Sequence, residues 1–470
     1  MVGKAWNPCH AARGVASRPG FFLAVLILLT AIAGLGLAAS HAHAGGFAIR
    51  EQSTSGQGMA FAGIAAGGED ISAMFFNPAA LALYPGVNGY AALSYIAPHS
   101  EPSHIEASTV LGTPISGDRA SGNITDAELV PAVYASFEPV DRLYLGLGVN
   151  VPFGLRTEYP KTWAGRYHGV MSEVTTINLS PVIAARPLPW LTVGAGAQIE
   201  YIDAKLTNAI DSATIATLNG IPTVAEPNPD SFVKLSGDDV AAGFVLGAIV
   251  EPRRGTRVGI GYRSSIKHTL KGNANFTRSQ TGDLLNTLTT TPGGSGLLAD
   301  TSASVDFETP ALLSVGLTQD VGERWTVGTT LEWTSWSDFQ EIKVEFDNPD
   351  QPDNITDEDW NDTIYVALGA RYRLDDAWTL RAGVAFDQTP VPNRTRNPRV
   401  PDSDRYWLAA GVTWAPTSWF AVDGGLTQIF VDHARVDLST SGTDNATRGN
   451  LEADYDGNIV IATVAGKISF

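Results

Sequence analysis

The chain has 470 residues, of which 44% are hydrophobic and only 17% are charged, and it contains 48 glycines. Low charge and abundant glycine argue against a soluble helical enzyme and favour a membrane barrel, which can remain one domain at this length. The formal net charge of −18 argues against a nucleic-acid partner, because phosphate backbones require basic patches.

Residues 1–44 have the organisation of a secretory signal peptide. Basic side chains precede an apolar run at 21–39, and residues 42–44 (AHA) supply the small residues of a signal-peptidase site. Cleavage is expected before Gly45, and the loss of three positive side chains changes the net charge from −18 to −21. A retained transmembrane helix is the alternative, since the run is long for a signal core. The single cysteine, Cys9, lies in the removed segment, so no disulfide is expected.

Residues 45–86 differ from the rest of the chain. They are rich in small residues, with short helical stretches broken by glycine and no strand alternation. A solvated linker is the alternative, but this segment carries too many large apolar side chains for one: Phe47, Met59, Phe61, Phe75 and Phe76. We expect a compact N-terminal unit, separate from the strands.

From residue 87 to the end, apolar and polar side chains alternate with the period of two that indicates strands. The pattern is clearest at 378–386, where Trp378, Leu380 and Val384 share one face and Arg381 lies on the other. The fourteen candidate strands are 87–98, 127–138, 143–151, 172–186, 191–205, 238–251, 256–269, 307–319, 325–346, 363–373, 378–386, 405–415, 420–430 and 458–470.

The lengths of the connections alternate. Those after even-numbered strands are short turns, whereas those after odd-numbered strands are long, for example 206–237 and 270–306. Turns at one end and long loops at the other are typical of an antiparallel outer-membrane barrel, and a β-sandwich has no reason to show them. We therefore predict an all-β fold, a 14-stranded antiparallel transmembrane β-barrel, preceded by the compact unit at residues 45–86.

The closing strand ends in an aromatic residue, Phe470, after the outward-facing Val464 and Ile468. Such an end resembles the signal that outer-membrane assembly machinery recognises, and simple packing against lipid is the alternative. Outer-membrane lipids and lipopolysaccharide would surround the barrel.

Six motifs resemble the FadL family of outer-membrane long-chain fatty-acid transporters. They are GGFAIREQSTSGQG (45–58), NPAAL (77–81), YRSSIKHTLKGN (262–273), TSWSDFQEIK (334–343), GVAFDQTPVP (383–392) and PDSDRYWLAAG (401–411). The resemblance covers essentially the whole mature chain. It implies a barrel that is closed by a small helical hatch inside the lumen, residues 45–86, and that carries hydrophobic compounds without a cofactor and without enzyme activity.

Such cargo needs apolar surfaces. A methylene gains about 0.8 kcal/mol on leaving water, so a sixteen-carbon chain gains roughly 12 kcal/mol and does not cross a polar saccharide layer unaided. Apolar residues in the loops 206–237 and 270–306 would form the collecting groove. Disordered loops with scattered apolar residues are the alternative.

A carboxylate head group would require a cation in the lumen. Lys343 occupies the family's head-group position, and Arg381 and Lys205 are further candidates. Each could equally be paired with an acid. By the same resemblance, Phe47 would reach into the binding pocket.

The resemblance also implies a gate. Asn77 and Pro78 belong to the hatch motif next to a kinked third strand, and Pro152 follows Asn150 where that strand ends. Proline cannot donate a ladder hydrogen bond, so the wall near Asn150, Pro152 and Phe153 would open laterally. A strand that simply stops at Pro152 is the alternative.

The expected function is passive, ligand-gated uptake of long-chain fatty acids. One rival is uptake of alkanes or monoaromatic hydrocarbons by the same fold, and others are a lipid hydrolase and a structural or adhesive barrel. The histidines show no metal-ligand spacing, so no metal is expected. The acidic loop at 347–362 could hold Ca²⁺, but a solvated loop is the simpler interpretation.

Overall fold

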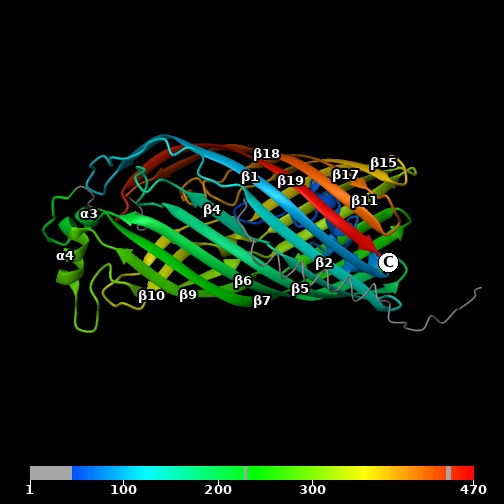
Figure 1. Cartoon of the computed structure of the whole chain (residues 1–470), viewed down its shortest axis with the longest axis horizontal. Helices are drawn as coiled ribbons and strands as arrows, with labels where there is room; N and C mark the ends of the chain where they lie inside the picture. Colours follow the sequence, from blue (N-terminus) through cyan, green and yellow to red (C-terminus); the bar gives the residue numbers. More distant parts are fainter. Residues whose placement is uncertain (1–44, 227–229, 441–445) are drawn as a thin grey trace, which may run out of the picture. The chain divides into compact units, whose positions relative to one another are not determined.

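Antiparallel strands build most of the molecule (Figure 1). The structure, a computed structural model, describes residues 45–226, 230–440 and 446–470. The expected signal peptide, 1–44, lies outside the described residues. The first strands are β1 Val87–Ser108, β2 Glu128–Val140, β3 Leu143–Asn150, β4 Gly154–Glu158, β5 Met171–Leu188, β6 Leu191–Ile210, β7 Ser231–Arg253, β8 Thr256–Arg263, β9 Ile266–Thr277 and β10 Thr301–Thr309. They are followed by β11 Leu312–Val321, β12 Trp325–Thr334, β13 Glu341–Phe346, β14 Asn354–Asp357, β15 Thr363–Arg373, β16 Trp378–Asp387, β17 Arg405–Trp414, β18 Phe420–Leu438 and β19 Asn450–Ser469.

These segments form a closed barrel of fourteen wall strands. Four wall strands consist of two segments each: β3 with β4, β8 with β9, β10 with β11, and β12 with β13. β14 pairs only with β13, and β19 closes the barrel by pairing with β1 along its whole length. The predicted strand number and antiparallel order are confirmed.

Three predicted strands are interrupted in the structure. The segment 256–269 is divided after Arg263, and 307–319 is divided at Pro310, which has no N–H to donate. The segment 325–346 is divided by the 3₁₀ turn η4, Trp336–Asp338, whose indole is buried inside the barrel. These breaks matter because alternation restarts after each one, so side chains beyond a break do not keep the predicted face.

The alternating faces meet different surroundings. Leu380 is 45% exposed, whereas Arg381 beside it is only 5% exposed, because apolar side chains face outward and polar ones face the lumen. Trp378 and Trp414, adjacent to the short turns, form an outward aromatic pair with ring centroids 6.3 Å apart. Aromatic rings at the ends of lipid-facing strands are typical of the membrane interface.

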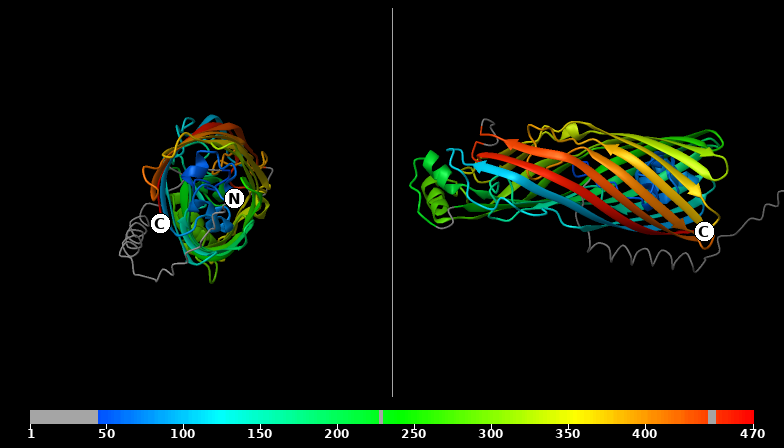
Figure 2. Two further views of the ribbon diagram at one scale, coloured as in Figure 1. Left: turned by 90° about the vertical axis from the view of Figure 1, so that its right-hand side faces the viewer. Right: turned by 90° about the horizontal axis from the view of Figure 1, so that it is seen from above.

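The hatch is a series of short helical turns inside the barrel, seen in blue in Figure 2. Its elements are α2 Thr54–Gln57, η1 Ile64–Ala66, η2 Ile71–Phe75 and η3 Pro78–Leu83. Three of the turns begin at side chains that accept a backbone N–H: Ser53, Asp70 and Asn77. Among the described residues, no helix has the length and apolarity needed to cross a membrane.

The hatch lies directly against the wall at glycines, in most cases through its own backbone atoms. A Cβ at Gly247 would lie 1.9 Å from Asn77 Oδ1, and one at Gly383 would lie 2.2 Å from the carbonyl carbon of Met59. We call these wall residues the glycine belt: Gly194, Gly247, Gly259, Gly261, Gly316, Gly328, Gly369, Gly383 and Gly411. The belt runs from β6 to β17, so most of the wall touches the hatch main chain.

Candidate functional site

Phe47 lies at the centre of an aromatic cage. Its ring centroid is 4.6 Å from that of Trp336, and four further rings lie within 5.4–6.0 Å. The cage consists of Phe153, Phe307, Trp336, Phe339 and Trp360. These residues come from four separate stretches of the wall and loops, so only the closed barrel assembles the cage. Phe47 is 2% exposed and fills it.

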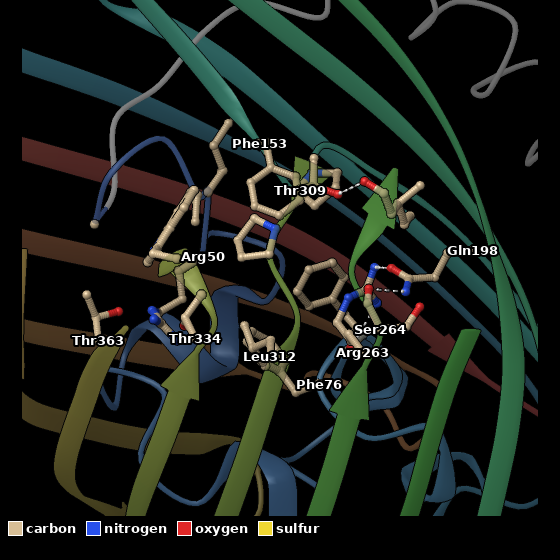
Figure 3. Close-up of a pocket in the computed structure, with 18 of the residues that line it drawn as sticks. Arg50, Phe76, Phe153, Gln198, Arg263, Ser264, Thr309, Leu312, Thr334 and Thr363 are labelled. Carbon is tan, nitrogen blue, oxygen red and sulfur yellow. Dashed lines mark hydrogen bonds between the residues drawn. The ribbon is translucent and has the colours of Figure 1, made fainter. Parts of the chain in front are cut away.

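A cavity opens beside the cage (Figure 3). Its walls include the apolar Ile49, Phe153 and Leu312, with Arg263 and Ser264 among the polar groups. The part of this space that can hold a water-sized sphere is about 40 Å³, and the wider space between the lining atoms, open solvent included, is about 670 Å³. Apolar walls with a few convergent polar groups are typical of small-molecule sites. We call this space the lumenal cavity.

The wall is irregular between β3 and β4. Asn150 is in register with Asn178 and Gly154 with Thr175, so three residues of one strand face two of its neighbour. Pro152 lies inside this bulge, where it cannot donate to a ladder. In the described part of the chain, β2 is in register with β3 only from Val133 onward, and β4 is in register with β5 but not with β2. We call residues 151–153 and the facing edge of β2 the wall break.

The N-terminal segment pairs with the wall break. The N–H of Ile49 donates to Pro152 O at 2.7 Å, and the N–H of Gly154 donates to Phe47 O at 2.9 Å. Ala48 and Phe153 form an antiparallel bridge. Residues 47–49 therefore supply backbone partners that β2 does not supply. The sequence predicted Phe47 in a pocket and an irregularity at Pro152, but not that one contact joins them.

Asn77 and Pro78 lie elsewhere in the barrel. The Asn77 amide donates to Ala65 O at 2.6 Å and to Ala248 O on β7 at 3.1 Å. Pro78 contacts the glycine belt at β6 and β7. These residues therefore position the hatch turn against β6 and β7, whereas the segment against the wall break is 47–49.

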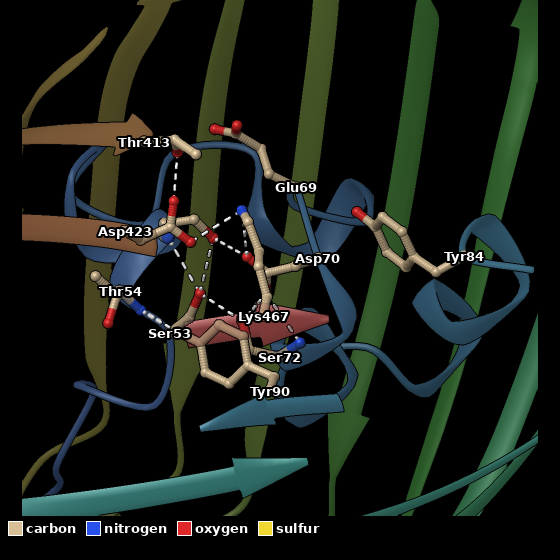
Figure 4. A network of polar contacts seen from close by, with 12 residues as sticks. Ser53, Thr54, Glu69, Asp70, Ser72, Tyr84, Tyr90, Thr413, Asp423 and Lys467 are labelled. Atoms are coloured by element: carbon tan, nitrogen blue, oxygen red, sulfur yellow. Dashed lines mark hydrogen bonds and ion pairs between the residues drawn. The ribbon is translucent and has the colours of Figure 1, made fainter. Parts of the chain in front are cut away.

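Arg381 belongs to a charged network that we call the hatch clamp. Figure 4 shows other members of this network, among them Glu69, Asp423 and Lys467. Arg381 Nε and Nη2 each donate to the Glu69 carboxylate at 2.6 Å. Lys467 reaches Asp423 at 2.9 Å and the hatch residue Asp70 at 3.5 Å. The clamp joins β16, β18 and β19 to the hatch. Arg381 is thus placed to hold the hatch rather than to line the lumenal cavity.

Neither candidate lysine lines the lumenal cavity. Lys343 Nζ lies 2.6 Å from Glu345 and 3.1 Å from Asp353. Its neighbour Ile342 packs against the cage cluster, and successive strand residues point to opposite faces, so Lys343 points away. Lys205 is paired with Glu173 at 2.8 Å and Asp203 at 3.0 Å. The sequence expectation for these lysines lacks geometric support.

The two longest loops meet at the end of the barrel opposite the turns. Each contains a helix, α3 Ser212–Leu218 and α4 Gln280–Thr289, which lie side by side. Some of their apolar side chains pack together, with Ala216 and Leu285 buried. Others, such as Leu218 and Leu288, are exposed. The open space beside these helices is about 1760 Å³, solvent included.

A buried carboxyl group lies behind the cage in the loop between β14 and β15. Burial raises the pKa of Glu358 to about 7, against hydrogen bonds that favour the charged form. Trp360 Nε1 and Asn397 Nδ2 each donate to this carboxylate at 3.0 Å. In residues 45–226, 230–440 and 446–470, no group of three or more His, Cys, Asp or Glu is arranged to hold a metal ion.

A closed fourteen-stranded barrel with an apolar outer face, an internal hatch and a lumenal cavity is a transport barrel of the bacterial outer membrane. The chain belongs to the family described as outer membrane protein transport protein (OMPP1/FadL/TodX), whose model matches residues 35–470. Proteins of this family are channels for hydrophobic compounds rather than enzymes.

Individual proteins with similar sequences or structures support this family assignment. The long-chain fatty acid transport protein of Escherichia coli K12 is 29% identical over 408 residues, covering 83% of this chain and 89% of that protein. A putative outer membrane protein of Neisseria meningitidis is 30% identical and covers 90% and 94%. A Pseudomonas aeruginosa FadL homologue of known structure is 25% identical, with a TM-score of 0.80 over 90% of this chain and 100% of that one. The Ralstonia pickettii toluene transporter TbuX shares the fold, at 19% identity and a TM-score of 0.63 over 89% and 98%.

Proposed function

We propose that the protein takes up long-chain fatty acids, or molecules of similar shape, by passive and ligand-gated diffusion. The observation that carries this proposal is the pairing of residues 47–49 with the wall break, directly beside the lumenal cavity. Residues 47–49 fill the aromatic cage and also pair with the wall break. Cargo that enters the cage can therefore open the wall break.

Capture begins at the loops. Ile215 and Leu297 line the open space near α3 and α4, and these two helices also carry the exposed side chains Leu218 and Leu288. An alkyl chain that leaves water there gains about 0.8 kcal/mol for each buried methylene. The alkyl chain of the cargo then exchanges one apolar surface for another as it moves inward, so no external energy source is required.

Gating follows from competition for the cage. An alkyl chain that enters the cavity displaces the Phe47 ring, because both require the same aromatic surfaces. Without the ring in place, the two backbone hydrogen bonds to Pro152 and Gly154 lose their anchor. The N-terminal segment then separates from the wall break, and the cargo leaves sideways into the membrane.

The rest of the hatch stays in place during this cycle. Arg381 and Glu69 hold it by two charge-assisted hydrogen bonds, and the glycine belt contacts its main chain from β6 to β17. Movement is therefore confined to the residues before Ser53. The last strand, ending at the exposed Phe470, would be recognised by outer-membrane assembly machinery, and lipopolysaccharide would surround the loops.

An engineered disulfide tests the gate. Directly opposed residues of an antiparallel pair lie at Cα separations of about 4.5–5.5 Å, within the range that a disulfide spans. The double variant Ala48→Cys/Phe153→Cys should therefore crosslink, and the mature chain has no other cysteine if cleavage occurs before Gly45. Oleate uptake should be lost when this variant is oxidised and should return on reduction. The single variant Ala48→Cys should not respond to oxidant. Full uptake by the fully crosslinked protein would refute the gate.

Uptake of aromatic hydrocarbons is the second candidate. The five-ring cage around Phe47 is the observation that favours it, since aromatic rings pack well edge to face with aromatic cargo. Such cargo carries no charge, so the two candidates differ in whether the cavity needs a cation.

A further inference from the structure

Arg263, the last residue of β8, is a buried cation at the lumenal cavity (Figure 3). It is only 6% exposed. Its Nη1 donates to Phe75 O at 3.1 Å, Nη2 donates to Gln198 Oε1, and the guanidinium lies 4.1 Å from the centroid of the Phe75 ring. All of these partners are uncharged.

Among the described residues, Arg396 and Arg399 in the loop after β16 are also buried with only uncharged acceptors, but neither lines the lumenal cavity. Three buried arginines that lie nearer the hatch have carboxylate partners. Arg50 is paired with Glu332, Arg381 with Glu69, and Arg405 with Asp402. Within the described residues, no carboxylate lies within 4.0 Å of the Arg263 guanidinium.

Two carboxylates, Glu200 and Glu332, interact electrostatically with Arg263 from more than 4.0 Å, and both have closer partners. Glu200 accepts from Asn178 Nδ2 at 3.2 Å and lies 3.4 Å from His268. Glu332 is paired with Arg50. Neither acid is therefore available as a close partner for Arg263.

An uncompensated charge in an apolar site is costly, so its retention calls for a partner that arrives with the ligand. A guanidinium has five N–H donors in a planar fork that suits a carboxylate. Among the described residues, this guanidinium donates two hydrogen bonds, one to Phe75 O and one to Gln198 Oε1. The remaining donors can hold a carboxylate without breaking the contacts to Phe75 and Gln198.

We infer that Arg263 recognises the head group of the cargo and makes the lumenal cavity selective for an anionic amphiphile, a carboxylate on a long alkyl chain, over an uncharged hydrocarbon. The inference rests on the proposed function. The apolar walls at Ile49, Phe153 and Leu312 would hold the chain. Because Phe153 also belongs to the wall break, the head group would bind beside the exit.

The test compares two ligands of equal chain length, palmitate and 1-hexadecanol, on the purified mature protein in detergent. Wild type should bind palmitate more tightly. Charge-assisted hydrogen bonds predict that Arg263→Met weakens palmitate binding by roughly 10- to 100-fold. Hexadecanol binding should change by less than about threefold, since its hydroxyl makes only neutral hydrogen bonds. Arg263→Lys should retain part of the preference, because the charge remains.

Two control variants separate recognition from hatch anchoring. Arg381→Met removes another buried arginine that holds the hatch, and it should affect both ligands equally. Lys343→Met removes the rival cation and should leave the palmitate preference intact. Equal weakening of both ligands by Arg263→Met, or loss of the preference in Lys343→Met, would overturn the inference.

The same measurements distinguish this inference from the proposed function. If wild type binds and transports palmitate but Arg263→Met keeps the preference, only the role of Arg263 fails. If wild type binds neither ligand, the proposed function itself fails.

Discussion

The phenyl ring of Phe47 meets the indole of Trp336 edge to face, with ring centroids 4.6 Å apart. This contact joins the beginning of the described chain to the 3₁₀ turn that divides the wall strand β12–β13. The same residue also contacts the wall break, because the backbone of residues 47–49 forms two hydrogen bonds with residues 152 and 154.

Removal of the Phe47 ring should loosen that seal. Truncation of a buried phenylalanine to alanine costs about 3–5 kcal/mol. If about 3 kcal/mol of this is lost locally, the amides of Ile49 and Gly154 in Phe47→Ala should exchange with solvent roughly 100-fold faster. Native-state hydrogen exchange measures this change. Phe430→Ala, on the lipid-facing side, serves as the control and should leave both amides unchanged. Equal protection in Phe47→Ala and wild type would contradict the coupling.

The glycine belt should not tolerate a side chain. In Gly383→Ala the new Cβ would lie 2.2 Å from the carbonyl carbon of Met59, and backbone cannot yield as a flexible side chain can. Overpacking of this kind costs about 1–3 kcal/mol or more, so the apparent melting temperature in detergent should fall.

The matched control for the belt is Gly466→Ala on β19, where no atom lies within 4 Å of the new Cβ. The apparent melting temperature of this variant should equal that of wild type when both are measured at the same scan rate. Equal melting temperatures for the two alanine variants would show that the hatch is not seated against the wall at Gly383.

The hatch clamp should depend on charge pairing. Arg381→Met removes the closest cation from Glu69 and a more distant one, at 3.8 Å, from Asp423, and breaking one side of a buried pair costs about 3–5 kcal/mol. Exchange protection of hatch residues 69–72 should fall accordingly. The double variant Arg381→Met/Glu69→Gln should recover part of the loss, because it removes one of the stranded charges. A double variant no more protected than the single one would argue against direct pairing.

The loop that contains Glu358 should become less stable as the pH rises. Its pKa of about 7 lies above the value of 4.5 for an unburied glutamate, so the folded loop binds a proton that the unfolded loop releases. Below about pH 4.5 both states are protonated, and between about pH 4.5 and 7 the stability of the loop decreases progressively. Hydrogen exchange of residues 358–362, corrected for intrinsic rates, should show this trend in wild type.

Substitution of the titrating group supplies the control. Glu358→Gln keeps the shape of the side chain but cannot ionise, so its loop should show the same protection at pH 5 and pH 8. A pH trend that persists in Glu358→Gln would show that a group other than Glu358 causes it.

Much of the fold could be predicted from local pattern. Alternation in 378–386 and 405–415 identified the lipid-facing side chains. The alternation of short turns with long loops identified fourteen antiparallel strands. The apolar, glycine-interrupted stretch after Gly45 predicted a compact unit apart from the strands, and the family resemblance implied that this unit is an internal hatch. These features were accessible because each depends on neighbouring residues only.

The site was harder to predict. Arg263 lies within the motif YRSSIKHTLKGN, yet nothing in its neighbours shows that it lacks a carboxylate partner. Lys343 follows the turn at Trp336–Asp338, where strand alternation is interrupted, so its motif did not reveal that it points away from the cage. Arg381 was predicted correctly to face inward, but its partner Glu69 comes from the hatch.

The amino-acid sequence by itself determined which side chains face lipid, how many strands cross the membrane and that residues 45–86 form a compact unit apart from the strands. A period of two and the lengths of loops are local properties, and they survive any arrangement of the strands. Only the tertiary structure decided which charges neutralise one another and which one faces the cavity alone, because those distances are set by barrel closure and by the seating of the hatch against its glycines.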